Sequence, residues 1–339
     1  MLWVGSRDGM EQGLVEQAGL TFTAIPAGGL RGKNPVALLT GAWKLGRGFL
    51  ASRRIIREFQ PDALFITGGY VGVPVTLAAR LLGIPVLIYL PDIEPGLAIK
   101  FLARFADKVA VTMEDARQFF PAGLTVVTGY PVRAELTAGR QPPQKLAARK
   151  QLNFDPTLPL LLVFGGSRGA RSINKAIAAE AEAYLNICQI MHITGPLDEA
   201  WVTDVRTELP PALRARYQVR SYLHDDMSTA LIAADLVVSR AGASTLGEFP
   251  ALGLPAILVP YPYAGAHQAL NAAYLARYQA AVVIDDALLS QQLKDTVLSL
   301  LTDSIKLQAM SRASQALAQP QAALCLAQEI LGVSRHGRN

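Results

Sequence analysis

Short apolar runs alternate along the chain with longer segments in which apolar residues recur at helical spacing. The apolar runs have the length of strands, and we expect strands at residues 2–4, 22–25, 63–67, 86–90, 108–111, 124–127, 160–164, 188–193, 217–221, 236–239, 256–259 and 281–284. Segments 75–82, 173–184 and 244–252, which lie between these runs, have helical composition. Strands that are apolar on both faces and alternate with helices are typical of parallel sheets covered by helices. The pattern therefore predicts the α/β class with doubly wound sheets.

A polar stretch near the middle of the chain divides this pattern into two halves. Residues 134–159 contain Pro142-Pro143 among Arg, Lys and Gln, and they are expected to form a linker with a short helix. We therefore predict an N-terminal domain over 1–135, a linker over 136–158 and a C-terminal domain over 159–314. The last segment, 315–339, is expected to hold a helix over 321–331, with Pro320 in its first turn, and a basic tail.

Composition narrows the class of protein. Of the 339 residues, 51% are hydrophobic and 17% are charged, so the chain can bury large cores and is not a disordered protein. Two cysteines exclude a disulfide scaffold, and the four histidines are scattered, so neither a zinc site nor any other cofactor is expected. A net charge of +5 suits a phosphate-bearing or anionic-surface partner but is too weak to indicate nucleic acid.

The apolar stretch 63–91 has to be weighed against a membrane-spanning helix. Such a helix needs about 20 consecutive apolar residues. Here glycines and prolines interrupt the run, and two buried strands flanking a helix explain it better. Met1 leads directly into Leu2-Trp3-Val4 without the basic region of a signal peptide. We therefore expect a cytoplasmic protein that at most touches a membrane from outside.

Segment 28–57 carries the features of a membrane-contacting surface. Aliphatic and aromatic residues, Trp43 among them, are interleaved with seven cations: Arg31, Lys33, Lys44, Arg47, Arg53, Arg54 and Arg57. Such a mixture suits an anionic bilayer, where each cation adds about 1 kcal/mol. An ordinary amphipathic helix packing its apolar face on a sheet is the alternative.

Three strand-to-helix junctions in the second half carry candidate chemistry. In the first, the apolar run 160–164 enters Gly165-Gly166-Ser167 before a helical segment. Glycines allow close approach of a ligand, and the free N–H groups of a helix start favour a phosphate, to which Ser167 adds a hydroxyl donor. A tight turn that simply requires small residues is the alternative.

The second junction, over 236–248, again leads from an apolar run into small residues and a helix. Ser244 is a candidate N-cap, and Glu248 follows about one turn later. A carboxylate at this place can accept two hydrogen bonds from a ribose diol, whereas the alternative is a solvated glutamate that complements the helix dipole. Pro250 is expected to break or kink the helix.

The third junction, over 259–272, presents His267 and Gln268 at the start of a helix. Gln268 can offer its amide to a sugar hydroxyl, and His267 has no carboxylate partner in the pattern. No Asp-x-Asp occurs in the chain, so a metal-bridged diphosphate is not favoured. Helix dipoles and backbone N–H groups are then expected to stabilise a leaving diphosphate.

Together with the segments 2–11, 25–33, 68–71 and 127–133, these junctions resemble the MurG family of glycosyltransferases in order and spacing. The resemblance implies a GT-B fold, in which two Rossmann-like domains face a cleft and the final helix crosses back. It also implies inverting, metal-independent transfer of N-acetylglucosamine from UDP-N-acetylglucosamine to undecaprenyl-diphospho-N-acetylmuramoyl-pentapeptide, in peptidoglycan synthesis at the membrane. The implied donor-site residues are Arg133, Gly166 and Ser167 for the diphosphate, His224 for uracil, Ala243, Ser244 and Thr245 in the donor turn, Glu248 for ribose, and Gln268 for the sugar.

Three features depart from the family pattern. Asp92 stands where the family has a sugar-contacting asparagine, and Tyr130 replaces another asparagine. The family's first strand and the glycine-rich histidine loop that bears its general base would lie upstream of Met1, so the first domain is expected to lack a strand and no catalytic base is assigned. We expect an assigned start at an internal methionine. A related enzyme with another donor or acceptor, and a non-catalytic UDP-sugar-binding protein, are the alternatives.

Overall fold

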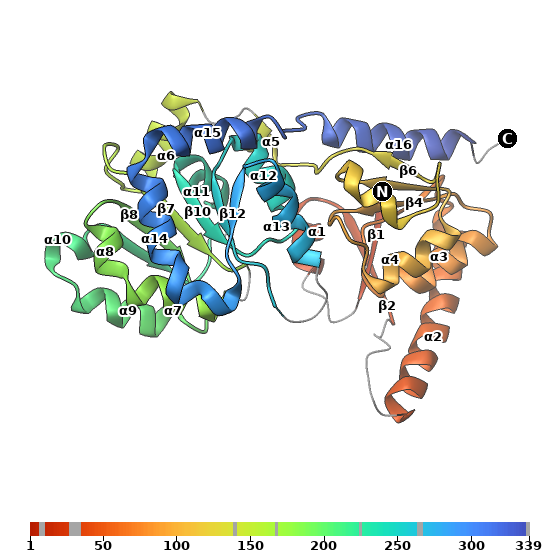
Figure 1. Cartoon of the computed structure of the whole chain (residues 1–339). Helices are drawn as coiled ribbons and strands as arrows, with labels where there is room; N and C mark the ends of the chain where they lie inside the picture. Colours follow the sequence, from red (N-terminus) through yellow and green to blue (C-terminus); the bar gives the residue numbers. More distant parts are fainter. Residues whose placement is uncertain are drawn as a thin grey trace. The chain divides into compact units, whose positions relative to one another are not determined.

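The computed structural model describes residues 1–6, 11–26, 35–137, 141–166, 169–223, 226–262 and 267–336. The chain divides into two compact units (Figure 1). Residues Met1–Gly129 and Leu324–Asn339 form the first unit, and Tyr130–Ala323 form the second.

The second unit is built on a six-stranded parallel sheet with the order β12-β11-β10-β7-β8-β9. The four central strands are buried along most of their length, which explains why their sequences are continuous apolar runs rather than alternating ones. The strand order reverses between β7 and β10, the arrangement of a doubly wound fold. The strands are β7 (Leu160–Phe164), β8 (Gln189–Ile193), β9 (Tyr217–Arg220), β10 (Leu236–Ser239), β11 (Ala256–Leu258) and β12 (Ala281–Val283).

Helices cover both faces of this sheet (Figure 1). On one face, α7, α8, α9 and α14 share a core with alternate residues of the strands, such as Leu161, Val163 and Val238. The helices of the unit are α5 (Ala134–Thr137), α6 (Pro142–Gln151), α7 (Arg171–Ala179), α8 (Ala181–Leu185), α9 (Glu199–Glu208), α10 (Pro211–Arg214), α11 (Met227–Ala233), α12 (Thr245–Leu252), α13 (His267–Arg277), η3 (Asp286–Leu288), α14 (Leu289–Thr302) and α15 (Ser304–Gln315).

The first unit contains two separate parallel sheets. Strands β1 (Leu2–Ser6) and β2 (Thr21–Ile25) form one, and β3 (Leu64–Ile66), β4 (Val86–Leu90), β5 (Lys108–Val111) and β6 (Thr125–Val127) form the other in that order. No pairing joins the two sheets within the described residues. Its helices are α1 (Glu11–Gln17), α2 (Pro35–Phe59), α3 (Gly72–Leu81), α4 (Leu97–Leu102), η1 (Ala103–Phe105) and η2 (Glu114–Phe119).

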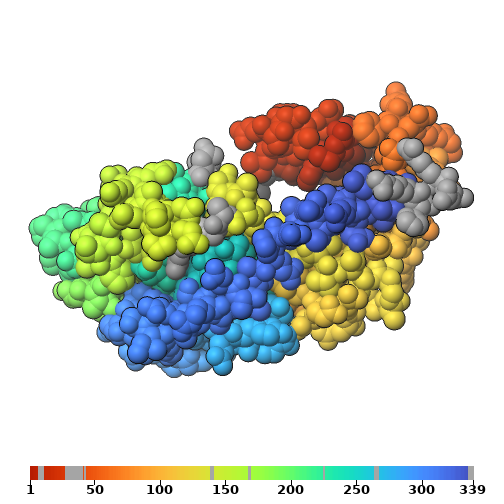
Figure 2. Space-filling view, turned by 90° about the horizontal axis from the view of Figure 1, so that it is seen from above, coloured from red at the N-terminus to blue at the C-terminus, as the bar shows by residue number. Residues whose placement is uncertain are grey.

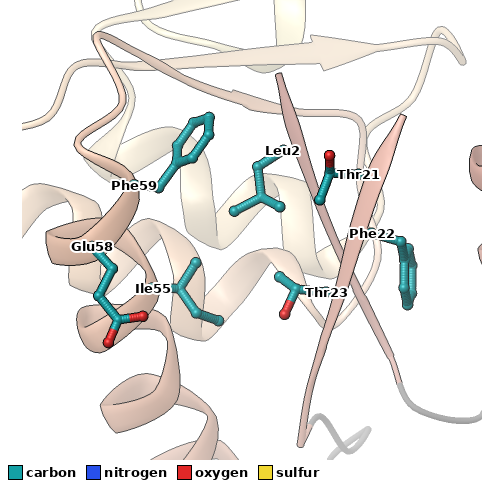
Figure 3. Close-up of a pocket in the computed structure, with 7 residues that line it drawn as sticks. All are labelled: Leu2, Thr21, Phe22, Thr23, Ile55, Glu58 and Phe59. Atoms are coloured by element: carbon teal, nitrogen blue, oxygen red, sulfur yellow. The ribbon is translucent and has the colours of Figure 1, made fainter. Parts of the chain in front are cut away.

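Both sheets nevertheless contribute to one core, in which Ile25 of β2, Ile56 of α2 and Ile66 of β3 are buried together. Gly48 brings α2 close to its neighbours, because a Cβ at this position would lie 2.4 Å from the carbonyl oxygen of Pro26. A cavity of about 390 Å³ lies between the two strands of the small sheet and the C-terminal part of α2 (Figure 3). Leu2, Thr21, Phe22, Thr23, Ile55, Glu58 and Phe59 line this cavity.

The last helix, α16 (Ala322–His336), returns to the first unit from the far end of the chain. Leu326 and Val333 pack with Leu87, Tyr89 and Ala110 on the larger sheet. Lys108 Nζ lies 2.6 Å from Glu329 Oε2, an ion pair that joins β5 to this helix. Figure 2 shows α16 lying along the surface of the first unit.

The predicted strands are all present, and every strand end lies within two residues of the expected one. Three helix predictions need correction. The helical segment expected over 173–184 is broken at Glu180 into α7 and α8. Helix α12 continues through Pro250 instead of ending there, and α16 begins after Pro320 rather than containing it.

Candidate functional site

The reversal of strand order in the second unit places two turns side by side. Strand β7 pairs with β10 in parallel, with Phe164 opposite Ser239, so the turns that follow the two strands leave the same edge of the sheet. In open α/β sheets, ligands bind outside the carboxyl ends of the strands at such a switch point. The first two of the predicted junctions are these two turns.

The turn after β7 is shaped by its glycines. Gly166 has a φ of +92°, and a Cβ added there would meet none of the described residues within 4 Å, so among them open space lies beside this backbone. Gly169 has a φ of +76°, and its Cβ would lie 2.0 Å from the carbonyl oxygen of Thr194. One glycine therefore leaves room for a ligand, and the other packs the turn against β8. Ser167, the predicted diphosphate ligand in this turn, lies outside the described residues.

A buried polar network holds the helix that follows this turn. The Asn174 side-chain amide donates to the carbonyl of Thr194 (2.8 Å) and to Asp198 Oδ2 (2.9 Å), so its oxygen faces His192 Nε2 at 3.0 Å. His192 Nε2 must then carry the hydrogen, and Nδ1 accepts from the Tyr217 hydroxyl at 2.8 Å. Burial lowers the pKa of His192 to about 3, so the ring is neutral at physiological pH. These contacts fix α7 against β8.

The turn after β10 is closed by its own polar groups. The Thr245 hydroxyl donates to the carbonyl of Gly242 at 2.7 Å, and this side chain is buried. Asn271 of α13 donates from Nδ2 to the carbonyl of Ala241 at 3.1 Å. Ser244 stands at the N-cap position but makes no side-chain capping bond, which corrects the expected capping role. Its hydroxyl hydrogen-bonds the Glu248 carboxylate instead.

Glu248 lies half-buried one turn into α12, beside a cation. Burial raises the pKa of its carboxyl, although the charge of Arg133 and the bond from Ser244 act in the opposite direction. The Arg133 guanidinium lies 3.4 Å from the Ser228 hydroxyl of α11. Tyr130 packs on α12, because a Cβ at Gly247 would lie 2.6 Å from its ring. The group can therefore bind a diol through the carboxylate and an anion through the guanidinium.

Gln268 belongs to the third junction and lies in the first turn of α13. Its Oε1 accepts a hydrogen bond from the backbone N–H of Tyr261 at 2.9 Å. A backbone N–H can only donate, so this contact identifies the oxygen and leaves the amide NH₂ group for other partners. His267 precedes it and is partly buried.

The described candidates of the second unit thus occupy the carboxyl edge of one sheet: Arg133, Gly166, Ala243, Ser244, Thr245, Glu248 and Gln268. Asp92 belongs to the first unit, where it follows β4 and is half-buried. His224, expected to meet uracil, lies outside the described residues. Sequence reasoning gave no role to Asn271 or Arg240. For Arg240, its place directly before Ala241-Gly242 was the available signal.

Comparison with known proteins decides the family. Residues 1–111 match the Glycosyltransferase family 28 N-terminal domain, and residues 160–325 match the family's C-terminal domain. A protein of Roseiflexus sp. (strain RS-1) is 42% identical over 96% of this chain and 82% of its own length. It is named UDP-N-acetylglucosamine--N-acetylmuramyl-(pentapeptide) pyrophosphoryl-undecaprenol N-acetylglucosamine transferase. The chain belongs to the MurG family.

Two further comparisons agree with this membership of the MurG family. A protein of Desulforudis audaxviator (strain MP104C) with the same name is 42% identical over 95% of this chain and 87% of its own. The crystal structure of Acinetobacter baumannii MurG superposes with a TM-score of 0.75 at 27% identity, covering 97% of this chain and 90% of that one. The GT-B architecture expected from the sequence is thereby confirmed.

Proposed function

We propose that this protein transfers N-acetylglucosamine from UDP-N-acetylglucosamine to the N-acetylmuramoyl-pentapeptide carried on undecaprenyl diphosphate, a step of peptidoglycan synthesis. The observation that carries the proposal is 42% identity, over 96% of the chain, to a transferase named for this donor and acceptor. The Arg133, Ser244 and Glu248 group at the switch point supplies the chemistry that a nucleoside diphosphate needs.

In this function, the second unit binds the donor. Glu248 accepts hydrogen bonds from the two ribose hydroxyls, and a charge-assisted bond of this kind is worth about 1.5–3 kcal/mol. The diphosphate lies against the open backbone at Gly166, with Arg133 and the start of α7 countering its charge. Ala243 and Thr245 shape the donor turn, and Gln268 offers its NH₂ group to the sugar. Ser167 and His224 are proposed to complete the diphosphate and uracil contacts.

The same groups assist the reaction itself. As the bond between the sugar and the diphosphate breaks, negative charge grows on the leaving UDP. Arg133 and the N–H groups of the glycine turn stabilise this charge where it develops. Pre-aligned donors of this kind lower the barrier because they need no rearrangement during the reaction. We propose that transfer proceeds with inversion and without a metal ion.

The test is a transfer assay on the purified chain. Radiolabelled UDP-N-acetylglucosamine is offered with the undecaprenyl-linked muramoyl-pentapeptide, and label should move into the lipid fraction. A water-soluble muramoyl acceptor with another carrier serves as the comparison. Transfer to another acceptor only, or UDP binding with no transfer to any acceptor, would contradict the proposal.

We also propose that α2 attaches the protein to an anionic membrane surface. Gly48, Ser52 and Ile56 are buried on one side of the helix, whereas Trp43 and Leu50 on the other side are 70% and 64% exposed. Residues 43, 47, 50 and 54 follow one another at helical spacing, so Arg47 and Arg54 share the face of these two apolar residues. Within the described residues, none of the helices has the length and apolar character required to span a bilayer. An acceptor with a lipid carrier brings the reaction to such a surface.

A further inference from the structure

Arg240 occupies the point at which four segments of the second unit meet. It directly follows β10 and precedes the turn that leads to α12. Its side chain is only 10% exposed, and it contacts α7, the end of β11 and η3. An arginine in this position has five N–H donors, all of which need partners once water is removed.

The contacts of the guanidinium form a closed network. Nη1 lies 2.5 Å from Asp286 Oδ1. Nη2 donates to the Ser172 hydroxyl at 2.9 Å, and that hydroxyl in turn donates to Asp286 Oδ1 at 2.6 Å. Asp286 thus balances the charge of the guanidinium, and Ser172 hydrogen-bonds both side chains. Partners that satisfy one another hold their geometry better than isolated pairs do.

The other side of Arg240 reaches the loop that carries the sugar-facing residue. Nη1 also lies 3.2 Å from the carbonyl oxygen of Val259 and 3.3 Å from that of Pro260. The guanidinium stands 5.4 Å from the centre of the Tyr261 ring, a cation–π contact. The Tyr261 N–H is the group that holds Gln268 Oε1, so Arg240 is linked to the amide through one short stretch of backbone.

We propose that Arg240 is a positioning residue for recognition of the donor sugar. It fixes the Val259–Tyr261 backbone, which orients the Gln268 amide so that its NH₂ group, and not its oxygen, meets a sugar hydroxyl. A donor whose hydroxyl points elsewhere, as in the 4-epimer, then loses that bond. The proposal rests on the proposed function, because it requires Gln268 to face the sugar of a UDP-sugar.

The test compares UDP with UDP-N-acetylglucosamine and UDP-N-acetylgalactosamine by calorimetry. Arg240→Lys keeps the charge but cannot reach the same set of acceptors. Loss of one neutral hydrogen bond is worth about 0.5–1.5 kcal/mol. We therefore expect UDP affinity to stay within about twofold, UDP-N-acetylglucosamine affinity to fall about two- to twelvefold, and preference over the epimer to shrink accordingly. Arg277→Lys, on the exposed end of α13, is the matched control and should change none of these.

A double-mutant cycle separates positioning from general damage. In a Gln268→Ala background, Arg240→Lys should cause little further loss of sugar-dependent affinity, because the amide through which Arg240 acts is absent. Asp286→Asn, which leaves Arg240 without its balancing charge, should reproduce the pattern and serves if Arg240→Lys does not fold. Equal losses for UDP and UDP-N-acetylglucosamine, or full additivity with Gln268→Ala, would overturn the proposal. Failure of the unaltered protein to bind UDP would instead refute the proposed function.

Discussion

Glu248 combines a half-buried position with a proposed role as hydrogen-bond acceptor for a ligand, and burial usually opposes the charge that such a role needs. Because its pKa is raised in the folded protein, ionisation at neutral pH weakens folding relative to an exposed carboxyl. Stability from this group is present below the ordinary pKa of glutamate and is lost as pH rises through the raised value. Residues of binding sites often reduce the stability of the fold.

Replacement of this carboxylate should therefore separate stability from binding. We expect Glu248→Gln to melt at the same or a higher temperature without ligand, and to bind UDP about 10- to 150-fold more weakly, the equivalent of 1.5–3 kcal/mol. In the unaltered protein, UDP affinity should decline on acidification at a higher pH than an ordinary glutamate would cause, and this decline should vanish in the variant. Thermal melts and calorimetry at several pH values measure both effects. Glu135→Gln, exposed on α5, is the control; unchanged UDP affinity in Glu248→Gln would remove the diol assignment.

His192 makes a different prediction, on acid stability. Its pKa in the folded protein is about 3, below the ordinary value of 6.5, because the ring is buried among Asn174 and Tyr217. Between these two pKa values the unfolded chain binds a proton at His192 and the folded chain does not. The contribution of His192 to the free energy of unfolding is therefore fully present above pH 6.5 and is lost as pH decreases toward 3. Between pH 7.5 and 5.0 this residue should lower the free energy of unfolding by about 2 kcal/mol.

Urea unfolding at the two pH values, for the protein and for His192→Gln, measures the difference. The variant should be less stable overall but should lose about 2 kcal/mol less on acidification. An NMR titration of the His192 ring gives an independent reading in the unaltered protein. A ring that titrates near pH 6.5 would show that burial does not suppress its protonation.

At the scale of elements, the turn after β7 contains two glycines with opposite surroundings. Both have positive φ, so alanine at either position costs about 1–2 kcal/mol in backbone strain. At Gly166 the added methyl group would enter open space, whereas at Gly169 it would collide with the Thr194 carbonyl. We expect Gly166→Ala to fold with modestly lower stability and weaker UDP binding, since the methyl group would occupy the proposed diphosphate position.

Gly169→Ala should instead lose stability by clearly more than Gly166→Ala, because α7 has to move away from β8. Melting temperatures and UDP affinities of the two variants, measured side by side, test this contrast. Equal destabilisation would mean that the contact with the Thr194 carbonyl adds nothing to the backbone strain that the two positions share. Undiminished UDP binding by Gly166→Ala would place the diphosphate elsewhere.

The elements also show what the sequence could and could not predict. Strands were found because continuous apolar runs of strand length have few other uses in an α/β chain. The expected break of α12 at Pro250 is wrong, because the helix continues to Leu252. Pro250 lies near the helix end and removes only one backbone hydrogen bond, and the burial of Phe249 and Leu252 favours the helical path. The break at Glu180 left no comparable signal in composition. Local propensity thus located the elements, and tertiary packing decided their ends.

The candidate site also contains parts that the sequence could predict and parts that it could not. Glycine-rich turns after apolar runs could be located from the sequence as candidate phosphate sites, because such residues act through their own backbone. The network of Arg240 could not be predicted, since its partner Ser172 lies 68 positions away along the chain. Only the strand order, with β7 beside β10, brings these residues together. Contacts between residues so far apart in the sequence can be identified only once the fold is known.

At the scale of the whole molecule, the proposed attachment to a membrane depends on one face of α2. Arg47 shares the exposed face of Trp43 and Leu50, and Lys44 is exposed next to Trp43 in the sequence, so cations and apolar side chains are presented together. Each cation near an anionic surface contributes about 1 kcal/mol, and the attraction weakens with salt because the screening length falls to about 3 Å at 1 M. Reversal of both charges should remove at least this attraction without loosening the fold, since neither side chain is buried.

We expect Lys44→Glu combined with Arg47→Glu to reduce co-sedimentation with anionic vesicles by at least about 30-fold at low salt, the equivalent of 2 kcal/mol. Trp43→Ala should weaken binding to anionic and neutral vesicles alike, because it removes apolar contact and no charge. Lys150→Glu combined with Lys306→Glu makes the same charge change on exposed positions of the second unit and should leave vesicle binding within a fewfold of the unaltered protein. Equal losses for the two double variants would show that net charge, and not the face of α2, governs binding. Equal sedimentation with neutral vesicles at high salt would argue against the electrostatic part of the attachment.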